Sequence, residues 1–297
     1  MSGNELVQQL INALSVGSIY ALLALGLSMV YSTLGILNFA YGELVTITGY
    51  TMYLCALGGV PFLLSCALGV TAALCASVLM ELTAFRPLRN ASFVTILFAS
   101  FAVSQVLQNV FRQTISARSK GVPVPDFFNS TVDIAGVRIS TVSLMTLGIG
   151  IASMVLLLLF MRKFRAGLQM RAAAEDLMTT RLMGVRANRV ILLAFAISGA
   201  LAGIAGVLWM ARTTAVNPTS GFVPILSAFI AIVIGGLGSV SGAVVGGFVL
   251  GTIEVFMHAL LPGSLVPFEQ AAALILVVAL LYVRPQGLVG KVQEAKV

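Results

Sequence analysis

Long apolar windows constrain this chain more than any other feature of its sequence. Stretches of about 20 mostly apolar residues, enough to cross a bilayer as a helix, follow one another with short polar breaks. Charged residues make up 9% of the 297 residues, against about a quarter in an ordinary soluble domain. We therefore expect an all-α polytopic membrane protein, folded as one transmembrane domain over residues 1–297.

Nine windows qualify as spans, so the sequence predicts a bundle of eight or nine transmembrane helices. The two windows flanking the Gly-rich stretch 235–242 are also typical of short or re-entrant helices that line a cavity, which keeps the count open. The predicted spans are residues 10–31, 37–57, 62–84, 92–111, 142–161, 190–211, 222–238, 240–258 and 268–284.

Lysine and arginine collect at three places, which sets the expected orientation, because short loops rich in these residues stay in the cytoplasm. The clusters are Arg86 with Arg89, residues 162–189, and the C-terminus from Arg284 onward. The span count puts all three in the cytoplasm and the N-terminus outside. The turn-rich outer loop 112–140 is expected to form a small cap. The net charge of +7 thus reflects topology, and we expect no nucleic-acid partner.

Small residues recur every four positions, as in Gly199 with Gly203 and Gly242 with Gly246. This spacing lets membrane helices approach closely, and we expect it to serve packing within the chain, with homodimerisation as the alternative. Gly-rich apolar segments near both ends also hint at an internal repeat of the kind found in transporters.

Polar groups inside a membrane are costly and are therefore candidates for function. Asn38, Tyr41 and Glu43 stand at the start of the second predicted span, and Asn217 follows the sixth. A carboxylate such as Glu43 either lies beside a pathway or is an interfacial or helix-capping group, and both interpretations stay open here.

Two further polar sets have simpler interpretations. Gln105, Gln108 and Asn109 are expected to form one polar helix face. Glu254 and His258 are one helical turn apart, and we interpret them as a helix-end pair because no third ligand for a metal is evident. We expect no metal site.

Residues 162–189 form the longest stretch that cannot span a bilayer, and their pattern predicts an amphipathic helix. Gly184 stands where such a helix ends. The acidic residues in the middle of the helix favour docking to a partner protein over insertion among lipid headgroups. The expected apolar face carries Ala174, Leu177, Met178 and Leu182.

The sequence lacks the features of a motor or an enzyme. A P-loop needs a lysine followed by serine or threonine, yet the residues after the four lysines are Gly121, Phe164, Val292 and Val297. One histidine and no matching nucleophile make an intramembrane enzyme improbable.

Several of these stretches together resemble the branched-chain amino acid permeases of bacterial ABC importers, over essentially the whole chain. One departure is Ser241, where the family pattern has proline, which puts the local loop shape in doubt. The matching stretches are 17–31, 38–43, 171–177 through Gly184, 202–206 with Asn217 and Pro218, and 235–239 through Gly251.

This resemblance implies a type II ABC importer-like fold in a bacterial inner membrane. It further implies a second related permease subunit, two ATPase subunits that use ATP, and an extracytoplasmic binding protein for leucine, isoleucine or valine. The chain itself would bind no cofactor. Its cytoplasmic helix would couple to an ATPase through Arg171, Ala174, Glu175, Asp176, Leu177 and Gly184.

The expected path passes the ammonium and carboxylate of the substrate along Asn38, Tyr41, Glu43 and Asn217. Two alternatives remain. Related permeases serve urea, amides or other amino acids, and an ion-coupled secondary transporter would share broken helices and polar groups within the membrane.

Overall fold

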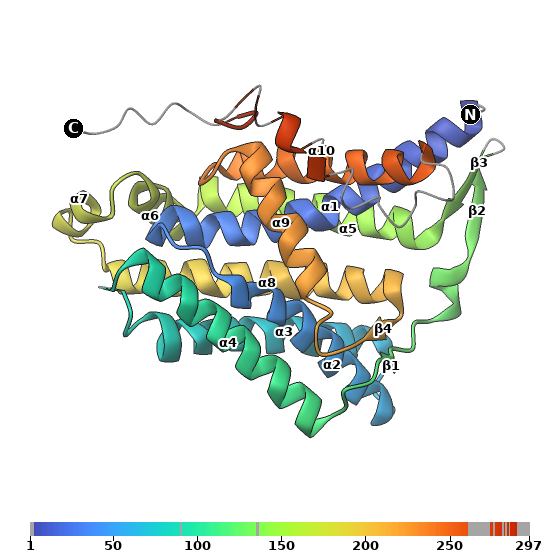
Figure 1. Ribbon diagram of the computed structural model, residues 1–297, viewed down its shortest axis with the longest axis horizontal. Coiled ribbons are helices and arrows are strands. Elements are labelled where there is room, and N and C mark those ends of the chain that lie inside the picture. The colour runs from blue at the N-terminus through green and yellow to red at the C-terminus, as the bar shows by residue number, and fades with distance from the viewer. Residues whose placement is uncertain are drawn as a thin grey trace.

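The computed structural model describes residues 3–89, 91–134 and 137–260, and residues 274, 275, 277–280, 282, 284 and 286–289. Helices along the long axis of the molecule make up most of this part of the chain (Figure 1). Six helices are long and apolar enough to cross a membrane, so the chain is a multi-pass membrane protein. They are α1 (Gly3–Leu34), α3 (Phe62–Met80, continued by the π-helical η2, Glu81–Phe85), α4 (Phe93–Thr114), α5 (Thr141–Lys163), α8 (Ala187–Thr213) and α10 (Val240–Leu260).

Two predicted spans are shorter than the hydropathy pattern indicates. Residues 37–57 hold the 3-10 turn η1 (Phe39–Gly42) and α2 (Glu43–Leu57), and residues 222–238 hold α9 (Phe222–Gly235). With 15 and 14 residues, neither helix reaches across a hydrocarbon core of about 30 Å. The short-helix alternative is therefore confirmed for α9, but α10 is full length. The span predicted at 268–284 lies largely outside the described residues, and the total count stays a prediction.

The loop between α4 and α5 forms the small cap that its turn-rich composition predicts. It contains η3 (Asp126–Asn129) and an antiparallel hairpin of β2 (Thr131–Ile134) and β3 (Val137–Ser140). A second small sheet pairs β1 (Lys120–Gly121) with β4 (Ala215–Val216). These strands are an addition to the predicted all-helical fold. We call this end of the bundle the hairpin end.

The first two basic clusters lie together at the opposite end (Figure 1), which we call the basic end. α6 (Arg165–Glu175) and α7 (Leu177–Leu182) lie there between α5 and α8. Of the C-terminal cluster the structure describes Arg284, whose carbonyl accepts from the Gly287 amide at 3.0 Å. The next amide, of Leu288, donates to the Ile234 carbonyl of α9 at 2.7 Å, so Arg284 lies near the end of α9. Placing this end in the cytoplasm stays a prediction.

Turns that flank the two short helices repeat at a fixed distance along the chain. Gly35 and Thr214, which follow α1 and α8, have left-handed backbones with φ of 68° and 52°. Gly59 and Gly238, which follow α2 and α9, have φ of 71° and 80°. Both pairs are 179 residues apart, from 35 to 214 and from 59 to 238. A left-handed residue ends a helix, so the order of long helix, turn, short helix and turn occurs twice.

The two copies run in opposite directions. From the middle of the bundle, α2 points toward the hairpin end and α9 toward the basic end (Figure 1). Inverted repeats with interrupted helices are a recurrent architecture of transporters. The internal repeat at which the sequence hints therefore has a structural counterpart.

Small residues bring the long helices together. α1 packs against α5, α8, α9 and α10, while α8 packs against α1, α2 and α3. Gly199 and Gly203 lie so close to α3 that an added Cβ would crowd the α3 backbone, and Gly246 lies equally close to α9. The expected packing within the chain is confirmed at these positions.

Candidate functional site

Two short helices meet with their N-termini at the centre of the bundle (Figure 1). A Cβ added to Gly42 or Gly221 would collide with the carbonyl oxygen of the other glycine. The Gly221 amide also donates to Thr46 Oγ1 at 3.0 Å. We call this contact the central junction. The positive ends of both helix dipoles face it, as they do at the substrate sites of many transporters.

Glu43, the first residue of α2, is 2% exposed and faces α4. Its Oε1 accepts hydrogen bonds from Ser104 Oγ and Gln108 Nε2, both at 2.8 Å. Its Oε2 has no hydrogen-bond partner among the described residues. The interfacial or capping alternative does not fit, because the side chain is buried and its bonds go to another helix. The orphaned oxygen can accept a bond from a proton donor or an ammonium group.

Asn38 and Tyr41 are buried beside Glu43, with 3% and 1% exposure. The Tyr41 hydroxyl donates to the Ser198 carbonyl of α8 at 3.1 Å and fills the space that a side chain at Gly26 would need. Asn38 Oδ1 has no partner within the described chain. Three of the four residues predicted to line a path thus converge on the central junction.

The fourth predicted path residue, Asn217, holds a turn. Its Oδ1 accepts from the Thr219 amide at 2.9 Å and from Thr219 Oγ1 at 3.1 Å. The backbone N–H of Asn217 donates to Ser220 Oγ at 2.8 Å. Asn217 therefore shapes the connection that leads into α9, and its side-chain oxygen is already engaged there.

The predicted polar face of α4 is wrong. Gln105 and Asn109 are exposed, whereas Gln108 is buried. The stripe that faces the junction consists of Ser100, Ser104 and Gln108, and the two serines were missed. Their spacing of four residues was the available signal, because residues i, i+4 and i+8 share one helix face.

At the basic end, the single amphipathic helix predicted within residues 162–189 is wrong at Asp176. This residue has an extended backbone (φ −155°, ψ 105°), and its carboxylate accepts from the amides of Met178 (2.8 Å) and Thr179 (3.1 Å). Asp176 is therefore the N-cap of α7, which separates α7 from α6. The predicted stop at Gly184 is confirmed, since its φ is +83°.

The expected apolar face of this segment is largely open. Met178, Leu182 and Met183 are 70%, 85% and 81% exposed. Apolar side chains gathered on a surface commonly mark an interaction site. Among the predicted coupling residues, Leu177 is partly buried, and the exposed ones are Arg171, Ala174, Glu175, Asp176 and Gly184.

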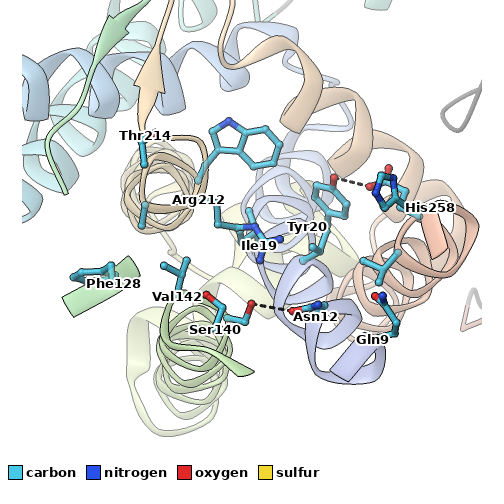
Figure 2. Close-up of a pocket in the computed structure, with 16 residues that line it drawn as sticks. Gln9, Asn12, Ile19, Tyr20, Phe128, Ser140, Val142, Arg212, Thr214 and His258 are labelled. Atoms are coloured by element: carbon cyan, nitrogen blue, oxygen red, sulfur yellow. Dashed lines mark hydrogen bonds between the residues drawn. The ribbon is translucent and has the colours of Figure 1, made fainter. Parts of the chain in front are cut away.

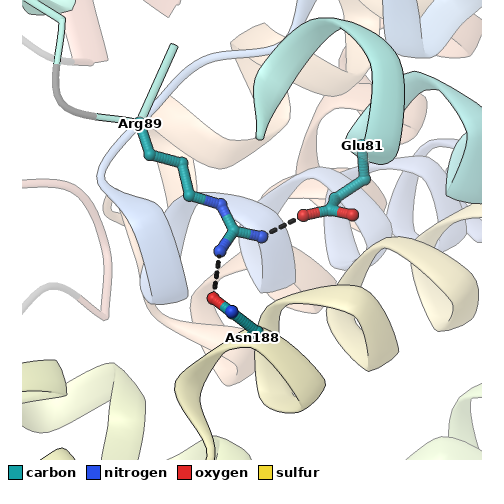
Figure 3. A network of polar contacts seen from close by, with 3 residues as sticks. All are labelled: Glu81, Arg89 and Asn188. Carbon is teal, nitrogen blue, oxygen red and sulfur yellow. Dashed lines mark hydrogen bonds and ion pairs between the residues drawn. The ribbon is translucent and has the colours of Figure 1, made fainter. Parts of the chain in front are cut away.

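An ion pair beside this segment, together with a hydrogen bond from the same arginine, links η2 to α8 (Figure 3). Arg89 pairs with Glu81 of η2, whose side chain is 2% exposed. Its Nη1 also donates to Asn188 Oδ1 at 2.6 Å. Losing one partner would leave a buried charge uncompensated, which is strongly destabilising. The pair therefore fixes the first turn of α8, directly after α7.

Comparison with known proteins places the chain. A family model described as branched-chain amino acid transport system / permease component matches residues 9–284. The chain belongs to this family. The permease is 34% identical to the high-affinity branched-chain amino acid transport system permease protein BraD of Pseudomonas aeruginosa, over 98% of both chains. It is 33% identical to LivH of Escherichia coli, a permease of the same description, over 98% of this chain and 97% of the other.

A solved structure also aligns with this permease. PsaBC from Streptococcus pneumoniae in complex with Fab matches 93% of this chain and 91% of that chain, with 12% identity and a TM-score of 0.48.

The departure at Ser241 leaves the local structure ordered. Ser241 is the second residue of α10, and Ser239 Oγ accepts from the Gly242 amide at 3.0 Å just before it. The first turn of a helix accommodates either serine or proline, because the amides there have no partner within the helix.

Proposed function

We propose that this chain is the permease subunit of an ATP-driven ABC importer in a bacterial inner membrane, and that it moves leucine, isoleucine and valine. The observation that carries the proposal is family membership over residues 9–284. It is supported by relatives that align over nearly their whole length and are named high-affinity branched-chain amino acid transport permeases.

The importer contains a second related permease, two ATPase subunits and an extracytoplasmic binding protein. The ATPases hydrolyse ATP, because no lysine in this sequence has the serine or threonine that a P-loop requires after it. The chain contributes no catalytic residue, cofactor or metal ligand.

The surface of α6 and α7 receives the ATPase. Its exposed apolar side chains Met178, Leu182 and Met183 fit a groove in a partner, and Glu175 adds charge at its edge. ATP binding shifts the permease only if the ATPase contacts differ between its two states. Arg89 helps to transmit that difference, because it holds the start of α8 through Asn188.

The substrate passes the central junction. Phe39, three residues before Gly42, stacks on Phe101 with ring centroids 4.4 Å apart, and the centroid of Phe229 lies 5.9 Å from that of Phe39, so these rings are the gate we propose. A branched aliphatic side chain passes these rings once they separate. The substrate ammonium meets the orphaned oxygen of Glu43, and its carboxylate faces the helix N-termini.

A reconstitution experiment tests this function. Proteoliposomes that contain both permeases and the ATPases, supplied with binding protein and internal ATP, are expected to accumulate leucine. Uptake of urea or amides in place of leucine would favour the alternative that this permease carries one of the other substrates of the family. Uptake by this chain alone under a proton or sodium gradient would favour an ion-coupled transporter, for which the buried Glu43 is the specific observation.

A charge reversal tests the coupling surface. Glu175→Lys is expected to abolish substrate-stimulated ATPase activity while leaving folding intact, because Glu175 is exposed. Asp176→Asn is the conservative companion, since asparagine also caps a helix. Arg86→Glu, an exposed charge reversal at the basic end but outside α6 and α7, is the control that should leave stimulation unchanged. Normal stimulation in the Glu175→Lys complex would exclude this contact.

A further inference from the structure

A pocket of about 640 Å³ lies at the hairpin end between α1, α5, α8 and α10 (Figure 2). This volume falls within the range of about 300–1,000 Å³ that is usual for small-molecule sites. None of the residues at the central junction lines it. The pocket is therefore a second site, displaced toward the side from which a binding protein would deliver its cargo.

The pocket presents opposite charges from two helices. Arg212 of α8 donates from Nη1 to Ser15 Oγ at 3.1 Å, and Tyr20 of α1 donates to Glu254 Oε2 of α10 at 2.6 Å. A guanidinium has five N–H donors, and the printed bond of Arg212 uses one of them.

Helix dipoles do not account for both charges. Arg212 lies in the last turn of α8, where a cation is favoured, but Glu254 lies in the C-terminal half of α10, where a carboxylate is not. Ionisable groups on membrane helices are costly and generally face a cavity or pathway. The helix dipole thus does not favour Glu254, which is held by Tyr20 and lines the pocket together with Arg212.

The remaining walls divide into a polar and an apolar side. Ser143 donates to Asn12 Oδ1 at 3.1 Å on one side, where Ser140 also lines the pocket (Figure 2). Val16, Ile19 and Val255 contribute apolar surface. A ligand with a cation, an anion and a compact aliphatic group matches this lining.

We propose that the pocket binds a free zwitterionic α-amino acid, with its carboxylate on Arg212 and its ammonium on Glu254 and Tyr20. The identity of the ligand rests on the proposed function. A phospholipid headgroup with an ammonium and a phosphate has the same chemistry, so the experiment separates these two sources.

Analogue binding to variants of the whole complex tests the proposal. The complex of permeases and ATPases is placed in nanodiscs of phosphatidylglycerol, which has no ammonium group. Binding is measured for radiolabelled leucine, leucinamide, which lacks the carboxylate, and 4-methylpentanoate, which lacks the ammonium. Arg212→Gln and Glu254→Gln are each expected to weaken leucine binding about tenfold or more.

The pattern across analogues separates ligand contact from a structural role. In Arg212→Gln the preference for leucine over leucinamide should disappear, and in Glu254→Gln the preference over 4-methylpentanoate should disappear. Arg212→Lys should keep part of the affinity. Arg138→Gln, which removes an exposed cation from β3 at the same end, should bind all three compounds as the wild type does.

Three outcomes would overturn the site. Wild-type affinity in both variants excludes contact, and an equal loss for all three compounds indicates a structural role. Phosphatidylethanolamine that co-purifies with the wild type, is lost from Arg212→Gln and is not displaced by leucine identifies a lipid site. Leucine uptake is measured in parallel in wild-type proteoliposomes. If the wild type imports leucine while the pocket fails these binding tests, the proposed site is wrong but the proposed function stands.

Discussion

α2 and α9 begin in the same way and then differ in their surroundings. Each follows an Asn-x-x-x-Gly sequence, yet the next residue is Glu43 in α2 and Phe222 in α9. Three positions further on, the side chain is Thr46 in one and Ile225 in the other. The repeated backbone therefore does not depend on the polar groups that one copy carries.

The neighbours of the two helices differ in the same sense. Glu43 at the start of α2 faces the hydroxyl and amide groups of α4, whereas Phe222 of α9 lines a small, mostly apolar pocket with Leu274 and Val277, which Ser227 and Glu254 also line. Both copies therefore share the backbone arrangement of a long helix followed by a short one, but of the two short helices α2 is the one that begins with a buried carboxylate. Four comparisons of variants test this division.

The largest effect is expected at the shared backbone contact. Gly221→Ala drives a Cβ into the Gly42 carbonyl oxygen, and overpacking against backbone should lower the free energy of unfolding by about 3 kcal/mol. Gly148→Ala on α5 is the matched control, since nothing lies within 4 Å of its added Cβ. Reversible unfolding in mixed micelles measures both, and equal stability of the two variants would contradict head-to-head contact.

The next effect separates the polar copy from the apolar one. Glu43→Leu leaves the donors of Ser104 and Gln108 without their acceptor, and should cost about 2 kcal/mol and abolish uptake. Glu43→Gln keeps an acceptor oxygen, so stability should change by less than about 1 kcal/mol while uptake falls about tenfold. Phe222→Leu is the reciprocal control and should leave uptake near normal. Full transport by Glu43→Gln would remove the carboxylate from the path.

A smaller effect is expected from Thr46, whose side chain bridges the two short helices. Thr46→Val removes the acceptor of the Gly221 amide, which should cost about 1 kcal/mol. Thr51→Val, also on α2, loses only a bond to the Ile47 carbonyl of its own helix and should change stability by less than about 0.5 kcal/mol. Indistinguishable unfolding curves would show that the bridge carries no net stability.

The smallest effect compares the two asparagines. Asn217→Ala breaks the turn before α9 and should cost about 1 kcal/mol. Asn38→Ala removes a buried oxygen without a partner in the described chain, so stability should stay within about 0.5 kcal/mol of the wild type. Uptake should respond in the opposite order, with Asn38→Ala the slower transporter. A larger loss of stability in Asn38→Ala would contradict the difference between the copies.

Sequence patterns predicted the long helices well, because a bilayer demands long apolar segments wherever it is crossed. They placed the start of the second span at residue 37, whereas α2 starts at Glu43. Hydropathy reports how apolar a residue is and not its backbone angles, so the left-handed turn at Gly35 and the extended stretch after it were invisible.

The candidate site was only partly predictable for a related reason. Asn38, Tyr41 and Glu43 were found because they are close in sequence and polar. The bond between Glu43 and Ser104 joins residues 61 positions apart, and the bond between Tyr20 and Glu254 joins residues 234 positions apart. No local sequence pattern relates residues at such distances. At Asp176, helical periodicity competed with the strong capping preference of aspartate, and capping prevailed.

α8 has a mechanical consequence in the proposed importer. It is one unbroken helix of 27 residues, a stiff rod of about 40 Å. Near its start, Asn188 accepts a hydrogen bond from Arg89, and further along the Ser198 carbonyl accepts one from Tyr41. In its last turn, Arg212 donates to Ser15. If a partner ATPase shifts the basic end of α8 by about an ångström or two, we expect Ser198 and Arg212 to move with it, because both lie on the same rigid helix. The coupling surface, the central junction and the pocket at the hairpin end would then respond together.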